Sequence, residues 1–207
     1  MRIIPYHSGP PTSVERPCCI RLLPGGRIPD RPAGVGLWLE GPDPQTLIRA
    51  ASPDRIDTLN SLWLDPALWE ACAPAIRRFS AVVLMPFDPA APESPYDTNV
   101  ERLLRLAEAR GVPRDALVVD LCVLPYGRQP DTDVYRARAE RLRSLGLRAV
   151  AGIDNLVYRE RDKFGLMDRL IRALEDIAAF GLISAKYARW ADERLAGVPN
   201  PNDTEGA

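Results

Sequence analysis

Short apolar segments alternate with amphipathic segments along most of the chain, and this alternation predicts strands that are each followed by a helix. The apolar segments do not carry a polar residue at every second position, which is typical of parallel strands that are buried on both faces. The predicted strands cover residues 35–39, 56–60, 81–85, 115–124, 148–152 and 182–185.

Aspartate, proline and glycine mark the predicted helix boundaries. Asp43 and Asp65 each precede a proline, a pair that is typical of an N-cap followed by the first helical residue. Gly111, Gly146 and Gly181 each follow an amphipathic segment and predict a helix end. The predicted helices cover residues 44–51, 66–79 with a bend at Pro74, 99–110, 133–145, 164–180 and 186–197.

The two ends of the chain differ from this pattern. Residues 1–34 are irregular and rich in proline, although the apolar pieces 2–6 and 18–23 could be short strands. Residues 35–197 form the predicted α/β domain, and 198–207 is expected to be a disordered tail. The alternation alone does not distinguish a (β/α)8 barrel from an open doubly wound sheet. No GxGxxG or Walker A loop favours a nucleotide-binding fold.

Composition narrows the classes of function. The 207 residues are 46% hydrophobic, which suits one globular domain with a core. The formal net charge of −1 gives no indication of nucleic acid or of an acidic membrane surface as a partner. The apolar runs are far shorter than the ~20 residues of a membrane span, and the N-terminus lacks the apolar stretch of a signal peptide. We therefore expect a cytoplasmic protein.

The 4 cysteines show no CxxC spacing and there is 1 histidine, so no metal site is expected.

Polar residues stand where the predicted strands end. Glu40 ends the first strand of the α/β domain, Asn60 the second, and Asp154 and Asn155 follow the fifth, while Asp120 lies within the apolar segment 115–124. The carboxyl ends of parallel strands meet at one edge, so these side chains are expected to converge. A carboxylate accepts two parallel N–H bonds and an asparagine both donates and accepts. The set suits binding and polarising a flat nitrogen heterocycle more than acyl transfer.

Each of these residues also has a structural interpretation. Asp154 could cap a helix, Glu40 could be a solvated loop acid, and Asn60 could close a turn. Asp120 is the hardest to explain in this way, because apolar residues follow it rather than a helix start, and a buried charge is costly unless it is paired.

Several of these segments together resemble a known family. "GLWLEGPDPQTLIRAA", "DTLNS", "AVVLM", "ALVVDLCVLPYG" and "VAGIDNL" are similar, in order and spacing, to motifs of the pterin-binding methyltransferases. These are the methyltetrahydrofolate:corrinoid methyltransferases and the folate module of methionine synthase; dihydropteroate synthase is a more distant relative. The similarity covers about residues 35–185. The lysine and Ser-Arg motifs of dihydropteroate synthase are not visible on the last strands, which favours the methyltransferase branch.

The resemblance implies a TIM (β/α)8-type barrel and a role for each candidate residue. Asp120 would hold the pyrimidine edge of a tetrahydrofolate-type pterin, with Asn60 beside it and Glu40 in the place of a second pterin-binding aspartate. Asn155 would hydrogen-bond near the reactive N5 and act in catalysis, and Asp154 would replace a serine beside it. The methyl acceptor would be the cobalt of a cobalamin or other corrinoid on a partner protein. The family also forms homodimers.

Two departures from the family pattern affect the interpretation. Glu40 is one methylene longer than the expected aspartate, and residues 1–34 are too short to supply two strand–helix units of a barrel that typically has ~250 residues. The barrel is therefore expected to be incomplete or remodelled there, with pieces 2–6 and 18–23 as bare strands or with an opening that a partner closes. The resulting hypotheses are a methyltransferase, a non-catalytic pterin-binding or scaffold subunit of a methyltransferase complex, and an unrelated α/β hydrolase or lyase.

Overall fold

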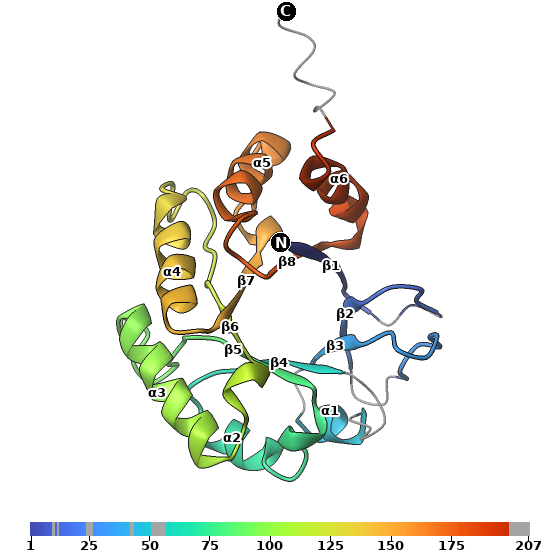
Figure 1. Ribbon diagram of the computed structural model, residues 1–207, viewed down its shortest axis with the longest axis vertical. Coiled ribbons are helices and arrows are strands. Elements are labelled where there is room, and N and C mark those ends of the chain that lie inside the picture. The colour runs from blue at the N-terminus through green and yellow to red at the C-terminus, as the bar shows by residue number, and fades with distance from the viewer. Residues whose placement is uncertain (10, 12, 24–26, 42–43, 51–56, 199–207) are drawn as a thin grey trace, which may run out of the picture.

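The strands of the protein close into a barrel around a central axis, as Figure 1 shows. This computed structural model describes residues 1–198 apart from 10, 12, 24–26, 42–43 and 51–56. Neighbouring strands are parallel and follow chain order, and β1 closes the barrel against β8 through pairs such as Ile4 with Leu182. The strands are β1 Arg2–His7, β2 Cys18–Arg21, β3 Leu37–Glu40, β4 Thr58–Leu62, β5 Ala81–Leu84, β6 Leu117–Asp120, β7 Arg148–Gly152 and β8 Phe180–Ser184.

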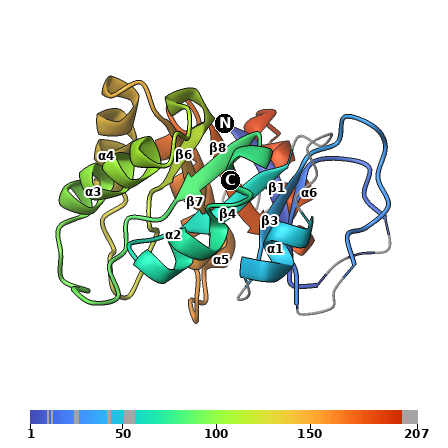
Figure 2. The same ribbon diagram turned by 90° about the horizontal axis from the view of Figure 1, so that it is seen from below.

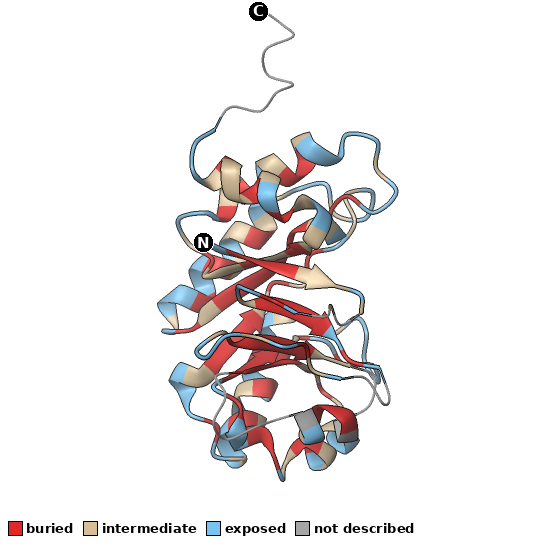
Figure 3. Ribbon diagram, turned by 90° about the vertical axis from the view of Figure 1, so that its right-hand side faces the viewer, coloured by how far each residue is buried: buried red, intermediate tan, exposed pale blue. Residues whose placement is uncertain are grey.

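Helices cover the barrel from β3 onwards. Each strand from β3 to β8 is followed by a helix whose apolar residues pack in the core. Figure 3 shows that the buried residues are concentrated on the strands and on the inner sides of the helices. The helices are α1 Pro44–Ala50, α2 Pro66–Cys72, α3 Tyr96–Ala109, α4 Asp133–Ser144, α5 Lys163–Leu174 and α6 Ala185–Leu195. Short 3-10 turns lie at Ile76–Arg78, Arg114–Ala116 and Ile153–Asn155. The predicted (β/α)8-type fold is confirmed, and the open doubly wound sheet is excluded.

The first two units of the barrel are remodelled as expected. In the described residues no helix follows β1 or β2, and the two apolar pieces of segment 1–34 supply both strands. In Figures 1 and 2 the loops after these strands occupy the side of the barrel between α6 and α1. Val14 belongs to the same buried apolar cluster as Cys18 and Ile20 of β2, and Ile28 packs against that cluster. The barrel is closed within one chain, so the prediction of an opening that a partner closes is wrong.

A buried ion pair anchors the loop that replaces the second helix. The Arg31 guanidinium donates to both carboxylate oxygens of Asp57, over 2.5 and 2.8 Å. The backbone N–H of Leu37 donates to the same carboxylate over 2.9 Å, and the Ser80 N–H donates to the Asp57 carbonyl over 2.8 Å. Asp57 is 1% exposed and the Arg31 side chain 6%. One aspartate before β4 therefore joins the β2–β3 loop, β3 and the start of β5.

Several predicted boundaries differ from the structure. The helix predicted over 66–79 ends at Cys72, because Pro74 cannot continue it. The helix predicted over 164–180 ends at Leu174, and β8 begins earlier than expected, at Phe180. The strand predicted over 115–124 ends at Asp120. The prediction that the apolar residues after Asp120 continue the strand is therefore wrong. The predicted cap Asp43 and most of the tail, residues 199–207, lie outside the described residues.

The inner face of the barrel has an apolar layer with a polar layer above it. Side chains alternate between the two faces of a strand, so residues two apart point the same way. The apolar inner layer comprises Ile4, Cys19, Trp38, Val83, Val118 and Val150, with Leu182 against it. Two residues further along each strand stand Tyr6, Arg21, Glu40, Met85, Asp120, Gly152 and Ser184, joined by Asn60 of β4. The sequence therefore places a ring of mostly polar residues at the carboxyl end of the barrel.

Candidate functional site

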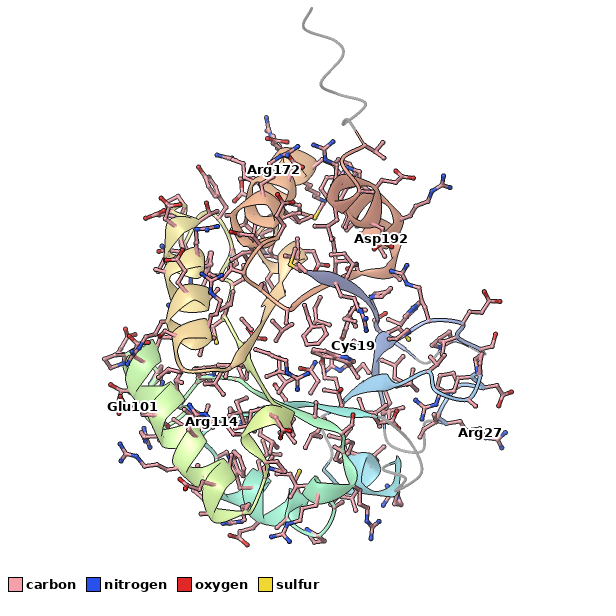
Figure 4. All side chains as sticks on the ribbon, in the orientation of Figure 1. Cys19, Arg27, Glu101, Arg114, Arg172 and Asp192 are labelled. Carbon is pink, nitrogen blue, oxygen red and sulfur yellow. The ribbon has the colours of Figure 1, made fainter. Side chains whose placement is uncertain are left out.

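The polar ring surrounds a cavity of about 590 Å³ at the carboxyl ends of the strands. Active sites of (β/α)8 barrels lie at this end, and the volume is within the usual range for small-molecule sites. Beneath the cavity lies the apolar inner layer, which includes Cys19 from β2, labelled in Figure 4. The cavity brings together every residue that the sequence analysis proposed for the site: Glu40, Asn60, Asp120, Asp154 and Asn155.

Asp120 contributes a carboxylate without an ion-pair partner among the described residues. It is the last residue of β6 and is half-buried, and its Oδ1 accepts a 2.6 Å hydrogen bond from the backbone N–H of Cys122. Burial raises the pKa of Asp120 to about 6; the Cys122 bond and the Arg138 charge counteract this, and Glu40 adds to it. The carboxylate is thus held at one point and still has acceptor capacity toward the cavity.

Glu40 is part of a group with two residues that the sequence analysis did not single out. Glu40 ends β3 in register with Arg21 at the end of β2, and Tyr6 of β1 completes the group. Burial raises the pKa of Glu40, and the Arg21 charge and a hydrogen bond with Tyr6 counteract it. Burial also raises the pKa of Tyr6, with the Glu40 charge as the next cause. Glu40 is therefore a cavity residue rather than a solvated loop acid.

Asn60 lies within β4 and not in a turn. It is 6% exposed, and its Nδ2 donates to the Sγ of Cys19 over 3.5 Å. That bond fixes which end of the amide faces the protein, so its Oδ1 remains to accept a bond from a ligand. The interpretation of Asn60 as a turn residue is wrong, because β4 continues to Leu62.

Asp154 and Asn155 occupy the 3-10 turn after β7 but differ in their contacts. The Oδ2 of Asp154 accepts bonds from the Ser184 N–H, over 3.1 Å, and from the Ser184 hydroxyl. Asp154 therefore joins the ends of β7 and β8 and does not cap a helix. Asn155 is exposed at the mouth, and its Nδ2 folds back over Gly152, where a Cβ would lie 2.5 Å from it. Only glycine at position 152 leaves room for this amide.

The cavity also contains residues that sequence reasoning missed, two of them from the first two strands. Tyr6, Arg21, Met85 and Ser184 line the cavity with the predicted set. Arg21 follows Cys19 by two positions, so the two side chains share the inner face of β2. The position of Arg21 on the inner face can be predicted only once residues 18–21 are known to form a barrel strand. Among the described residues, no group of three or more His, Cys, Asp or Glu side chains could hold a metal ion. No helix in the described part of the chain is long and apolar enough to span a membrane.

Solved structures with a similar fold include dihydropteroate synthases. The Yersinia pestis enzyme matches with a TM-score of 0.61 at 13% identity over 95% of this chain and 91% of that one. The Xanthomonas albilineans enzyme in complex with 7,8-dihydropteroate matches with a TM-score of 0.52 at 21% identity, over 81% and 70%. The same enzyme with indole-2-carboxylic acid and 6-chloroguanine gives 0.58 at 17% identity, over 97% and 94%.

Because the sequence identities are low, these likenesses establish the fold of the chain and nothing finer. A scan against models of protein families found no match, and neither did a search of curated proteins. The compared structures belong to the branch that the sequence motifs placed further away, so they do not single out the methyltransferase branch. The methyltransferase roles of Asn155 and its neighbours remain predictions.

Proposed function

We propose that the cavity binds a reduced pterin of the tetrahydrofolate type and that the protein transfers its N5 methyl group to the cobalt of a corrinoid on a partner protein. The observation that carries the proposal is the Asp120 carboxylate, which faces the cavity without an ion-pair partner among the described residues. The pyrimidine edge of a pterin offers two parallel N–H donors, and a carboxylate is the matching acceptor. Asn60, whose amide orientation is fixed by Cys19, supplies a further acceptor beside it.

Asn155 is the residue proposed to act on the reacting atom. When the methyl group leaves, N5 keeps the bonding electron pair and takes a proton from solvent, so a hydrogen-bond donor that stabilises the developing charge at N5 lowers the barrier. Asn155 is exposed at the mouth of the cavity, and its side-chain amide can donate to N5 while leaving the methyl group accessible to a partner. The corrinoid supplies the cobalt nucleophile; this chain binds the pterin and orients N5.

Ligand-dependent thermal unfolding tests the binding step. At a concentration of 5-methyltetrahydrofolate about 100 times its dissociation constant, the ligand should add about 2.7 kcal/mol of stability. Spectroscopic detection of methylcobalamin after mixing with reduced cobalamin then tests transfer. The absence of any shift at saturating pterin would contradict the proposal.

A non-catalytic pterin-binding or scaffold subunit is the second candidate function. It is favoured by two observations: Asp154 is bonded to Ser184, and Glu40 is surrounded by Tyr6 and Arg21. Both acids are therefore partly occupied by the protein itself. A thermal shift without methyl transfer to cobalamin, with or without a corrinoid protein, would select this function.

A dihydropteroate synthase activity is the possibility that the fold likeness raises. The ends of β7 and β8 carry Asp154, Asn155 and Ser184, and Arg21 of β2 is the basic side chain that lines the cavity in the described residues. The basic groups of that family on the last strands are thus replaced by acidic and neutral ones. An assay for 7,8-dihydropteroate formation is expected to give no product.

Gly152→Ala is expected to impair methyl transfer without unfolding the protein. The added Cβ would lie 2.5 Å from Nδ2 of Asn155, which is the movable end of an exposed side chain. Displacing it should cost about 0.5 kcal/mol or less in stability, as for other surface changes. Rates measured with cobalamin should fall by about 10-fold or more if the Asn155 donor matters. Gly9→Ala, at a site with no atom within 4 Å, is the control. A Gly152→Ala variant with wild-type rates would remove Asn155 from the mechanism.

A further inference from the structure

A cationic and aromatic cluster lies behind Asp120, on the side away from the cavity. Arg138 of α4 is half-buried, and its Nη1 donates to the carbonyl of Leu121 over 2.7 Å and to that of Cys122 over 3.5 Å. Its guanidinium carbon lies 4.2 Å from the ring centroid of Tyr96 and 5.7 Å from that of Tyr135. These carbonyl and aromatic contacts restrict the orientation of the Arg138 guanidinium.

The two tyrosines of this cluster hold the same segment at both ends. The hydroxyl of Tyr96 donates to the carbonyl of Asp120 over 2.9 Å, and the hydroxyl of Tyr135 accepts from the N–H of Leu124 over 2.9 Å. Between them Cys122 adopts φ of 51°, in the left-handed region. The Cys122 N–H donates to the Asp120 carboxylate, and the left-handed conformation of Cys122 redirects the chain after it. The segment 120–124 therefore aims Asp120, and Arg138 with its tyrosines fixes the segment.

The charges around Asp120 come from several elements. Glu40 of β3 is the acid that raises its pKa, and Arg138 of α4 is the cation that lowers it. Tyr96 of α3 and Cys122 stay neutral, since burial raises the pKa of both far above the neutral range. Among the ion pairs of the described residues there is none between Arg138 and Asp120; the Arg138 charge acts on the carboxylate while its Nη1 binds the Leu121 carbonyl. It acts from behind the backbone, so the carboxylate keeps its acceptor capacity toward the cavity.

We propose that Arg138 is a positioning residue for Asp120: by binding the carbonyls of Leu121 and Cys122 it keeps the Asp120 carboxylate charged and aimed at the ligand. A direct ion pair would charge the carboxylate but also occupy it. A cation on the far side of the backbone stabilises the negative charge of the carboxylate and leaves its oxygens available to the ligand. This inference rests on the proposed function in one respect, because the ligand of the test is a pterin.

The affinity of the protein for 5-methyltetrahydrofolate should depend on pH through Asp120. A protonated carboxyl group loses the ability to accept two parallel donors, so affinity should fall as the pH drops through about 6 in the wild-type protein. Without Arg138, only the Cys122 bond opposes the rise in the Asp120 pKa that burial and Glu40 cause. The midpoint of the pH dependence of affinity should therefore rise by about one pH unit. At roughly pH 6.5 to 7 the lost charge alone should weaken binding by the variant about two- to three-fold, and the difference in affinity that remains above about pH 8.5, where Asp120 is ionised in both proteins, measures the loss of aiming.

The test compares Arg138→Met, Arg138→Lys and Arg136→Met by calorimetric titration with 5-methyltetrahydrofolate across this pH range. Arg136 lies on the same helix but pairs with Asp176 and Glu140, so its removal is the control for losing an arginine from α4. The midpoint should rise in Arg138→Met and stay at the wild-type value in Arg136→Met and in Arg138→Lys, which keeps the charge. A midpoint that does not move in Arg138→Met, including a uniform loss of affinity at every pH, would overturn the proposal. A lysine variant that titrates like the methionine variant would also overturn the assignment to charge.

Titration of the ligand-free protein separates this inference from the proposed function. Carbon NMR of aspartate side chains gives the pKa of Asp120 directly, with Asp120→Asn identifying the signal. If the wild-type protein binds no pterin, the proposed function fails, but an upward shift of the Asp120 pKa in Arg138→Met would still support the role of Arg138. An unchanged pKa would overturn it whether or not a pterin binds.

Discussion

Asp120→Asn is expected to abolish pterin binding and, at the same time, to stabilise the ligand-free protein at neutral pH. The folded-state pKa of Asp120 is about 6, raised from 3.8 mainly by burial, so the folded protein binds this proton more tightly than the unfolded chain. Stability is then lost as the pH rises from about 4 to about 6 and stays lower above that range. A neutral amide avoids the penalty, and its Oδ1 can still accept the Cys122 N–H.

Urea unfolding at pH 7.5 and at pH 4 measures this effect. Because the carboxylate faces a cavity that water enters, the gain at neutral pH should be about 1–2 kcal/mol and should vanish near pH 4. Asp88→Asn is a control of opposite sign, since a bond from Arg102 is the main cause that lowers the pKa of Asp88. The stability that Asp88 contributes is present above its unfolded pKa and is lost as the pH falls. An Asp120→Asn variant that is less stable than wild type at pH 7.5, or that still binds pterin, would contradict this account.

Of the proposed variants, Arg31→Met is expected to lose the most free energy of unfolding. It leaves the 1% exposed Asp57 carboxylate without its bidentate partner and with the Leu37 N–H as its remaining bond. Removing one member of a buried ion pair costs about 3–5 kcal/mol, because an uncompensated charge stays buried. The loss matters here because this pair anchors the loop that stands in place of the second barrel helix.

Chemical denaturation of Arg31→Met beside Arg16→Met provides the measurement. Arg16 pairs with Asp192 over 2.7 Å, but the two side chains are 50% and 41% exposed, so this pair should contribute less than about 1 kcal/mol. Equal, small losses in the two variants would show that the Arg31–Asp57 pair does not anchor the barrel.

The sequence pattern predicts the barrel well from β3 onwards, where each strand and helix has its own periodicity. The first two strands have a weaker sequence signal, because Arg2–His7 and Cys18–Arg21 are separated by a proline-rich loop instead of a helix. Their role is decided by long-range pairing, such as that of β1 with β8, which local pattern cannot reveal. The buried pair of Arg31 and Asp57 is hidden for the same reason.

The candidate site was predictable where strand ends carry acids or amides. Glu40, Asn60 and Asp120 end or interrupt apolar segments, and the structure places all three on the cavity. The bond between Asp154 and Ser184 was not predictable, since Ser184 ends a strand whose start was misplaced. The left-handed turn at Cys122 was also hidden, because nothing in "DLCVLP" separates a continuing strand from a chain that leaves the sheet.

A crystal structure of the protein with bound 5-methyltetrahydrofolate tests the central claim most directly. We predict that both donors of the pyrimidine edge lie within roughly 2.6–3.2 Å of the Asp120 carboxylate, with N5 toward Asn155. A pterin bound elsewhere on the protein, or an Asp120 carboxylate that still contacts only its own backbone when the ligand is bound, would contradict the account.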